Sequence, residues 1–356
     1  MNRPAPPPRR RLIAVGRRRS RRRVQIALLA AIVLAVASVP AIARLMANLL
    51  WFQEVGYTRV LLTGLGARVA LFLVVAALVF AVVYGVARWA QRGPAPFFLK
   101  GPDGATLDVT GVVRRLTLPA ALLLAVLFGW AATGEWMTVL QALYATPFGT
   151  ADPVFGRDIG FYVLVLPLVA ALLGLLFTLG VVALVVAFGS AWLRRQVVVD
   201  PSRGLVVEPG AARQLAILGA LLFVVIAAST WLVRLPALLY STTGPLVGLS
   251  YTDFHAVRPG LHVVALAALA AAGLLVVYAR RRRLVRGALY AVGGFAVVSL
   301  LARVAYPAAV QRLAVDPTEL TRERPFLAHH IELTHATTLL REMPATRSPL
   351  TGALRE

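Results

Sequence analysis

Long apolar runs constrain this chain more than any other feature of its sequence. A helix that crosses about 30 Å of hydrocarbon needs roughly 20 mostly apolar residues. Seven runs meet this requirement, at residues 24–43, 69–89, 116–134, 162–192, 214–235, 260–279 and 287–306. They lack the alternation of a barrel strand, and an open sheet cannot satisfy its backbone groups in lipid. The sequence therefore predicts an all-α polytopic membrane protein with about seven transmembrane helices.

The basic residues predict how these helices cross the membrane. The formal net charge is +22, and the densest cluster, between Arg9 and Arg23, directly precedes the first apolar run. Cytoplasmic connections are enriched in Arg and Lys, and with the N-terminus inside, every inner connection is more basic than every outer one. We therefore expect the N-terminus inside and the C-terminus outside a bacterial plasma membrane. The lipid bilayer is the expected partner, and nucleic acid is not, because the charge abuts an apolar run.

These features divide the chain into three parts. Residues 1–23 form a basic cytoplasmic tail, residues 24–306 a seven-helix transmembrane region, and residues 307–356 a short extracytoplasmic segment. In two inner connections, apolar β-branched residues flank Pro, Asp and Gly, which predicts small hairpins near residues 97–109 and 197–207. Asp316 followed by Pro317 predicts the start of a short helix.

The sequence offers few residues for chemistry. There is no Cys, so disulfides, thiolate nucleophiles and Cys-ligated metals are excluded. Within the runs, Arg303 and His262 lie near predicted outer ends, from which both side chains can reach the interface. Small residues at Gly174 and Thr178, and at Ala268 and Ala272, predict close helix packing. We predict no catalytic, cofactor-binding or metal site, and we do not expect an enzyme.

Three strings of aromatic and polar residues lie on the predicted outer face, at 51–57, 151–162 and 251–255. One interpretation is an aromatic belt, since Trp and Tyr favour the membrane interface. The other is a shared outer surface, on which aromatic residues contact a partner and the acidic residues and His bind a hard cation or pair with Arg157. This candidate interaction surface comprises Trp51, Glu54, Tyr57, Asp152, Phe155, Arg157, Asp158, Tyr251, Asp253 and His255.

A further set of metal-type residues occurs near the C-terminus. His329, Glu332 and His335 recur every three residues. A zinc-binding His-Glu-x-x-His helix instead has its two His four residues apart, with Glu next to the first. We therefore predict no metal site there.

The aromatic strings also resemble uncharacterised protein family 0182. The matching residues are Trp51-Phe52-x-Glu54-x-Gly56-Tyr57, Asp152-Pro153-x-Phe155-Gly156-x-Asp158-Ile159-Gly160-Phe161-Tyr162, Tyr251-Thr252-Asp253-x-His255 and Pro317-x-Glu319-Leu320-x-x-Glu323-x-Pro325. The similarity covers roughly residues 24–335. It implies a bacterial membrane protein whose seven-helix region is followed by a large extracytoplasmic domain, and it implies no catalytic residues. Since the sequence stops resembling the family after His335, we expect a truncated or split reading frame.

Together these observations favour the membrane region of a cell-envelope protein that anchors or docks an extracytoplasmic domain, with an envelope protein as the expected partner. The alternative is a transporter or channel component, which needs a hydrated path through the helices. A membrane-embedded enzyme would need ionisable groups clustered at one membrane depth. The sequence contains no such cluster in its apolar runs, and it does not indicate an oligomeric state.

Overall fold

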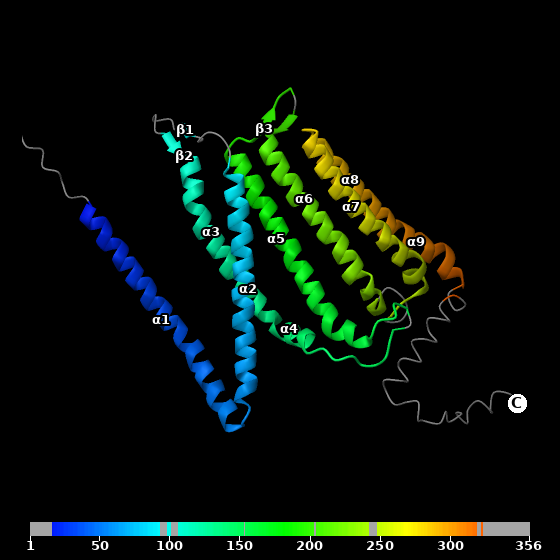
Figure 1. The fold of residues 1–356 in the computed structure, drawn as a ribbon, viewed down its shortest axis with the longest axis horizontal. Helices are drawn as coiled ribbons and strands as arrows, with labels where there is room; N and C mark the ends of the chain where they lie inside the picture. The colour runs from blue at the N-terminus through cyan, green and yellow to red at the C-terminus, as the bar shows by residue number, and fades with distance from the viewer. Residues whose placement is uncertain are drawn as a thin grey trace, which may run out of the picture. The chain divides into compact units, whose positions relative to one another are not determined.

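The computed structural model describes residues 16–92, 98–100, 106–152, 154–202, 204–241, 248–318 and 322. Seven helices in these residues are long and apolar enough to cross a membrane, which confirms the predicted all-α fold (Figure 1). They are Ala35–Glu54, Thr58–Ala90, Gly111–Leu143, Phe161–Leu193, Pro209–Arg234, Asp253–Arg280 and Leu284–Thr318.

The chain divides into two compact units, Met1–Ala67 and Arg68–Glu356. The first unit contains α1 (Gly16–Glu54) and the beginning of α2 (Thr58–Ala90). The apolar run predicted to end at residue 43 continues as helix to Glu54, so most of the first aromatic string is helical. Gly56, with φ at +81°, then turns the chain, and the Tyr57 amide donates to the Phe52 carbonyl at 2.9 Å. A left-handed glycine is a common way to end a helix.

The second unit contains the remaining described elements. After α2 come β1 (Phe98–Lys100), β2 (Thr106–Asp108), α3 (Val109–Ala132), η1 (Thr133–Glu135), α4 (Trp136–Leu143), η2 (Phe161–Val165) and α5 (Leu166–Leu193). Then follow β3 (Val197–Asp200), β4 (Gly204–Val207), α6 (Pro209–Ser229), η3 (Thr230–Arg234) and η4 (Pro236–Tyr240). The last are η5 (Asp253–Val257), α7 (Arg258–Arg280), α8 (Leu284–Leu300), η6 (Leu301–Ala305), α9 (Tyr306–Val310), η7 (Gln311–Val315) and η8 (Asp316–Thr318).

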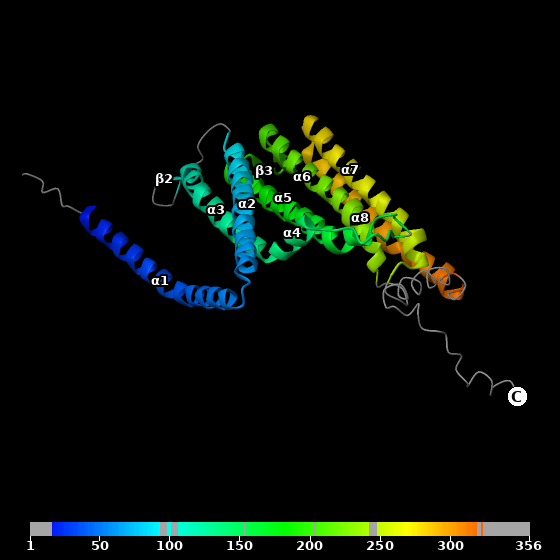
Figure 2. The ribbon, with the colours of Figure 1, turned by 60° about the horizontal axis from the view of Figure 1, so that its bottom comes forward.

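Small buried side chains hold the centre of this unit together. α5 packs against α6, α6 against α7 and α7 against α8, as Figures 1 and 2 show. Between α6 and α7 the core contains Ala227, Ala265, Ala268 and Ala272, all buried. Alanines let helix backbones approach closely, and this approach is a main source of association in lipid. The packing role predicted for Ala268 and Ala272 is confirmed.

Unlike Ala268 and Ala272, Gly174 does not pack closely against a neighbouring helix. A Cβ built on it would meet no atom within 4 Å, and Thr178 donates a hydrogen bond to its carbonyl within the same helix. The predicted close approach at this pair is therefore wrong. Gly174 instead lines a pocket between α5, α6 and α8.

One end of the second unit carries most of its arginines and both hairpins. β1 pairs antiparallel with β2, and β3 with β4 in the register Val197↔Val207 and Asp200↔Gly204, so both predicted hairpins are confirmed. α7 and α8 are joined here by a short turn in which Arg282 has a φ of +57°. We call this the arginine-rich end. Its arginines among the described residues are Arg88, Arg92, Arg114, Arg115, Arg194, Arg195, Arg213, Arg280, Arg281, Arg282, Arg283 and Arg286.

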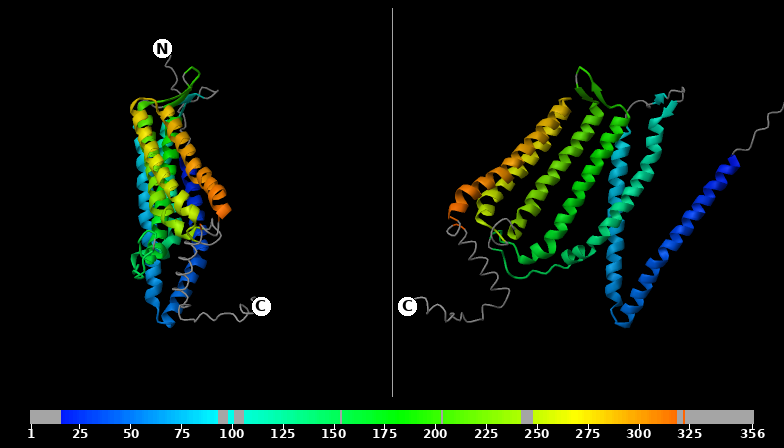
Figure 3. Two further views of the ribbon diagram at one scale, coloured as in Figure 1. Left: turned by 90° about the vertical axis from the view of Figure 1, so that its right-hand side faces the viewer. Right: turned by 180° about the vertical axis from the view of Figure 1, so that it is seen from behind.

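The opposite end carries the second and third aromatic strings, and we call it the aromatic end (Figure 3). The helices α5, α6, α7 and α8 each continue at this end into a π-helical turn, η2, η3, η5 and η6 respectively. π-helical turns are rare and occur often at functional sites. The recurrence of π-helical turns makes the aromatic end the candidate functional site.

The last helical column runs without a break from Leu284 to Thr318. It continues past residue 306, where the transmembrane region was predicted to end. Asp316–Thr318 is a 3-10 turn that follows η7 directly, and residues 319–321 lie outside the described residues, so the helix start at Asp316 stays a prediction. Pro325, His329, Glu332 and His335 lie outside the described residues.

Candidate functional site

The loop before α5 is organised by the carboxylate of Asp158. Its Oδ1 accepts hydrogen bonds from the amides of Phe148 at 2.9 Å and Gly160 at 2.7 Å, and its Oδ2 accepts one from Gly149 at 2.8 Å. An aspartate that accepts from an amide two residues later at a helix start is an N-cap. These amide hydrogen bonds, that of Phe148 first, hold the pKa of Asp158 below its ordinary value. The carboxylate thus ties the beginning of the loop to its end.

Asp152 makes a second turn inside the same loop. Its side chain is 6% exposed and accepts from the amides of Val154 at 3.2 Å and Phe155 at 2.6 Å. The hydroxyl of buried Tyr162 donates to it at 3.2 Å. Asp commonly bonds amides two or three residues later in turns. Asp152 therefore fixes the direction of Phe155 and connects the loop to the first turn of the fourth span.

Asp253 has a comparable role in the third string. Its amide donates to Ser250 Oγ at 3.1 Å, and its Oδ2 accepts from that hydroxyl at 2.9 Å and from the Ser250 amide at 3.3 Å. This reciprocal Ser-x-x-Asp arrangement is a capping box. Asp253 is 2% exposed, so its carboxylate is a buried structural group. The helical column that continues into α7 consequently begins at Tyr251, well before the predicted residue 260.

Arg258 brings the second and third strings together. Its guanidinium carbon lies 5.7 Å from the ring centre of Phe155 and 5.0 Å from that of Phe254. Cations over aromatic faces are attracted by the ring quadrupole. The two strings were predicted to lie on one face, but Arg258 was not among the candidate residues.

Tyr251 and His255 stack on one another, with ring centres 4.1 Å apart and an angle of 24° between the planes. His255 Nδ1 lies 3.1 Å from the Tyr251 carbonyl oxygen. On the other string, the guanidinium of Arg157 lies 4.6 Å from the ring centre of Phe161. We call Phe155, Arg157, Tyr251, Phe254 and His255 the docking surface, after the role that we propose for them below. All five side chains are at least partly exposed.

The chain that leaves the last column contacts this surface. Thr252 donates a hydrogen bond to Gln311, whose amide donates to Asp316 at 2.9 Å. The Arg322 guanidinium lies 4.9 Å from the ring centre of Tyr251 and donates to its hydroxyl. Residues far apart in the sequence therefore meet here, a contact that no local pattern indicates.

The first string belongs to the first unit. Trp51, Glu54 and Tyr57 are exposed, and the Trp51 and Phe52 rings meet edge to face at 4.9 Å. Within the second unit, the structure brings together candidate residues of the second and third strings.

The three aspartate carboxylates of the candidate set accept hydrogen bonds from backbone amides and do not bind one another. Among the described residues, no group of three His, Asp or Glu side chains is arranged to hold a metal ion. Cation binding by Asp152, Asp158 or Asp253 would compete with the hydrogen bonds that shape their own loops. This favours a structural role for the acids and leaves the aromatic and basic side chains for contact with a partner.

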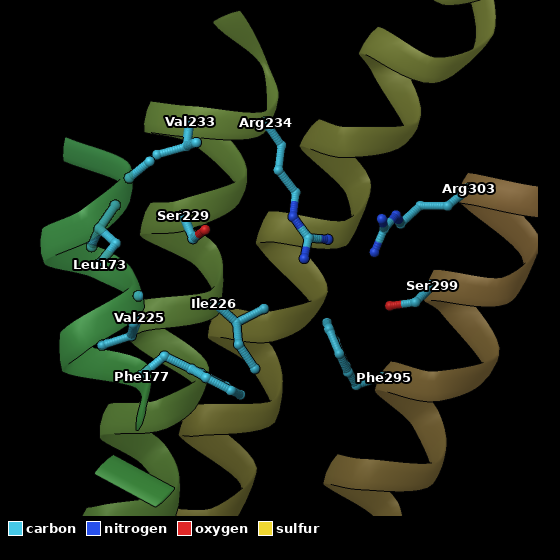
Figure 4. A pocket seen from close by; sticks show the side chains of 12 residues that line it. Leu173, Phe177, Val225, Ile226, Ser229, Val233, Arg234, Phe295, Ser299 and Arg303 are labelled. Atoms are coloured by element: carbon cyan, nitrogen blue, oxygen red, sulfur yellow. The ribbon is translucent and has the colours of Figure 1, made fainter. Parts of the chain in front are cut away.

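A pocket of about 370 Å³ lies between α5, α6 and α8 near the aromatic end (Figure 4). Arg234 of η3 and Arg303 of η6 both direct their guanidinium groups into it. The Ser299 Oγ is buried and has no hydrogen-bond partner among the described residues. Arg303 was predicted to reach the interface, and its proximity to Arg234 was not predicted. The lining residues are Ala170, Leu173, Gly174, Phe177, Val225, Ile226, Ser229, Val233, Arg234, Phe295, Ser299 and Arg303.

Comparison with models of protein families matches residues 25–354 to the Uncharacterised protein family (UPF0182). The chain belongs to this family. The match extends to residue 354, so the prediction that the similarity ends near His335 is wrong.

Similar UPF0182 proteins occur in several bacteria. The protein of Rhodococcus jostii is 36% identical over 296 residues, which is 80% of this chain and 30% of that protein. That of Moorella thermoacetica is 33% identical over 325 residues, covering 86% of this chain and 35% of that protein. That of Salinibacter ruber is 35% identical over 305 residues, covering 80% and 30%. The chain thus spans about a third of the length of these relatives, and no solved structure matches it.

Proposed function

We propose that this UPF0182 protein is the membrane anchor of a cell-envelope protein, and that its docking surface holds an extracytoplasmic domain. The observation that carries the proposal is the contact between the chain leaving the last column and the Tyr251 segment. Gln311 of the last column accepts a hydrogen bond from Thr252, and Arg322, which follows the column, contacts Tyr251 of the docking surface.

The sidedness of the proposal rests on the arginines. The arginine-rich end carries the basic connections that cytoplasmic loops favour, which supports an aromatic end that faces outside. Any domain that follows the last column would then emerge beside the docking surface. The longer family relatives have room for such a domain, since this chain covers only 30–35% of them.

The composition of the docking surface supports a protein partner. Aromatic residues and Arg are enriched in protein interfaces, and rigid rings lose little entropy on binding. Phe155 and Phe254 are held in place by Arg258, and Tyr251 by His255. A surface ordered in this way before contact binds at a lower entropic cost.

A fusion protein tests the docking. The part of the Moorella thermoacetica relative beyond the matched region is joined to this chain, and protease is added outside spheroplasts. The Tyr251→Ala variant is expected to release the fused domain about tenfold faster, equivalent to ~1.4 kcal/mol of docking free energy. Tyr290→Ala is the matched control, because Tyr290 is an exposed tyrosine of α8 outside the docking surface. Equal release from both variants contradicts docking through this surface.

A transporter or channel component is the alternative that the two arginines of the pocket favour. It requires water to reach the middle of the α6–α7 interface, where Ala268 is fully buried. Because the chain contains no Cys, Ala268→Cys introduces a single reactive thiol. Rapid modification of that thiol by a water-soluble reagent supports the alternative, and protection supports the anchor.

A further inference from the structure

Arg234 and Arg303 are arranged unlike other arginines of the aromatic end. Arg68, Arg157, Arg258 and Arg322 each place the guanidinium over an aromatic ring. Arg234 and Arg303 instead direct theirs into the same pocket (Figure 4). Within the described part of the chain, neither makes a hydrogen bond, an ion pair or a ring contact. Two like charges therefore share a space without a counter-charge.

The other polar groups of the pocket complement an anion. The lining contains no acidic residue among the described side chains. The buried Ser299 hydroxyl lacks a partner, and Figure 4 shows it on the side of the pocket toward the arginines. Buried hydroxyls almost always have a hydrogen-bond partner in native proteins, so an unpartnered one indicates a missing acceptor. An oxyanion between the two guanidinium groups would supply it.

Apart from Ser229, the remaining walls are apolar. Leu173 and Phe177 come from α5, Ile226 from α6 and Phe295 from α8, on either side of the space below the arginines in Figure 4. Gly174 keeps this part of the pocket open, since no side chain occupies the space beside it. Both arginine side chains are exposed at the protein surface, so the pocket is accessible from the membrane. These features suit a ligand with an anionic head and an apolar tail.

The depth of the arginines matches that of lipid headgroups. At 1.5 Å per residue, Arg303 lies about 28 Å along the helix from Leu284, close to the ~30 Å thickness of the hydrocarbon. Arg234 is the last residue of its span at the same end. A phosphate between them would lie at the boundary of the hydrocarbon on the side of the aromatic end.

We propose that this pocket binds the phosphate group of an anionic phospholipid. Arg234 and Arg303 bind the phosphate oxygens, Ser299 donates a hydrogen bond, and the acyl chain lies against Phe177 and Phe295. Guanidinium groups pair with phosphate through two parallel hydrogen bonds, which makes Arg well suited to this site. The pocket shares no residue with the docking surface, so the lipid site is independent of the proposed docking.

The test uses the full chain purified in detergent, with thermal unfolding and ligand titration as measurements. Phosphatidylglycerol is expected to raise the unfolding temperature and to bind at least about tenfold more tightly than zwitterionic phosphatidylcholine, a difference of ~1.4 kcal/mol. Inorganic phosphate distinguishes a lipid headgroup from free phosphate as the bound anion. If phosphate alone stabilises the protein as much as phosphatidylglycerol does, the lipid assignment is overturned.

Single arginine substitutions test whether the lipid binds in this pocket. Arg234→Gln and Arg303→Gln are each expected to weaken phosphatidylglycerol binding by at least about tenfold. Without lipid, both should unfold at the wild-type temperature or above it, because each removes a like-charge repulsion. Arg312→Gln is the matched control, since it makes the same charge change at an exposed position of η7 outside the pocket. Equal weakening by Arg312→Gln would show attraction to net charge alone and overturn the site.

Gly174→Leu tests the cavity without altering charge. The new side chain has space to enter the pocket, so the variant should fold and exclude the lipid. Undiminished binding of phosphatidylglycerol by Gly174→Leu would place the lipid elsewhere and contradict the proposal.

Discussion

The two ends of the second unit are closed in different ways. At the arginine-rich end, tight hairpins and a short turn join the helices, and polar side chains bond backbone carbonyls of α2. Arg194 donates to Ala90 at 2.9 Å, and Gln214 to Val86 at 2.9 Å. At the aromatic end, aspartate carboxylates cap the helices, arginines cover aromatic rings, and a pocket opens beside two π-helical turns.

The residues of the arginine-rich end mainly connect the helices, whereas those of the aromatic end form a specific hydrogen-bonded structure. Hairpins such as β3–β4 need only turn residues and a few apolar side chains to form. The aromatic end instead buries Asp152 and Asp253, each of which must be fully hydrogen-bonded to be tolerated. A membrane protein that needs only to span lipid has no use for such an end. This contrast favours the aromatic end as the site of function.

The largest expected effect comes from the contact between α7 and η6. A Cβ on Gly260 would collide with the carbonyl oxygen of Ala302, which belongs to the backbone of a π-helical turn and cannot rotate away. Gly260→Val is expected to lower the free energy of unfolding in detergent by about 3 kcal/mol. Gly273→Val on the same helix is the control, because its Cβ meets no atom within 4 Å. Equal loss in both variants would mean that the aromatic end is packed no more tightly than the rest of α7.

The next effect compares one aspartate from each end. Asp152→Ala leaves the buried Tyr162 hydroxyl and two loop amides without an acceptor, so it should cost about 2 kcal/mol. Asp200 caps the β3–β4 turn by accepting from the Ser202 amide at 2.7 Å, but it is partly exposed to solvent. Asp200→Ala should therefore cost about 0.5 kcal/mol. A reversed order in detergent unfolding would contradict the difference between the ends.

A smaller effect is expected from the arginine between the two strings. Arg258→Gln removes the cation from Phe155 and Phe254 and should cost about 0.5–1 kcal/mol. It should also speed proteolysis within residues 144–160, because the loop loses its contact with α7. Arg281→Gln at the arginine-rich end is the control. Unchanged proteolysis in Arg258→Gln would show that the two strings are held together by other contacts.

The smallest effect is the pH dependence of Asp158. Its pKa is lower in the folded loop, so the ionised carboxylate stabilises the fold above the unfolded value of about 3.9. This stabilisation is lost as the pH falls from there through the lower folded pKa. Wild type should therefore become less heat-stable below pH 4, whereas Asp158→Asn should lose less over the same interval. An equal loss of heat stability in the two proteins would show that this carboxylate does not stabilise the fold.

The helices and hairpins could be predicted because their signals are local. Long apolar runs require helices in lipid, and the residues around 200–204 form a turn with few alternatives. The start of the α7 column was missed although the capping box of Ser250 and Asp253 is a recognisable pattern. The apolar-run criterion places helix ends where hydropathy falls, whereas caps and π-helical turns continue the helix beyond that point.

The candidate site could be predicted only in part. The aromatic strings indicated which residues gather, but Arg258 and Arg322 act through tertiary contacts with distant rings. The pocket depends on residues of α5, α6 and α8 facing one space, and helices that are apolar on every side carry no pattern that selects neighbours. Because no pattern selects the neighbours of α5, Gly174 was predicted to pack against another helix and not to line a pocket.

The sidedness of the two ends is the central claim, and introduced cysteines test it most directly. Since the chain has no Cys, Ser202→Cys marks the arginine-rich end and Arg157→Cys the aromatic end with a single thiol each. A membrane-impermeant thiol reagent is added to intact cells and to permeabilised cells. The account predicts that the thiol at position 157 is labelled in intact cells and the thiol at position 202 only after permeabilisation. Labelling in the opposite order would contradict it.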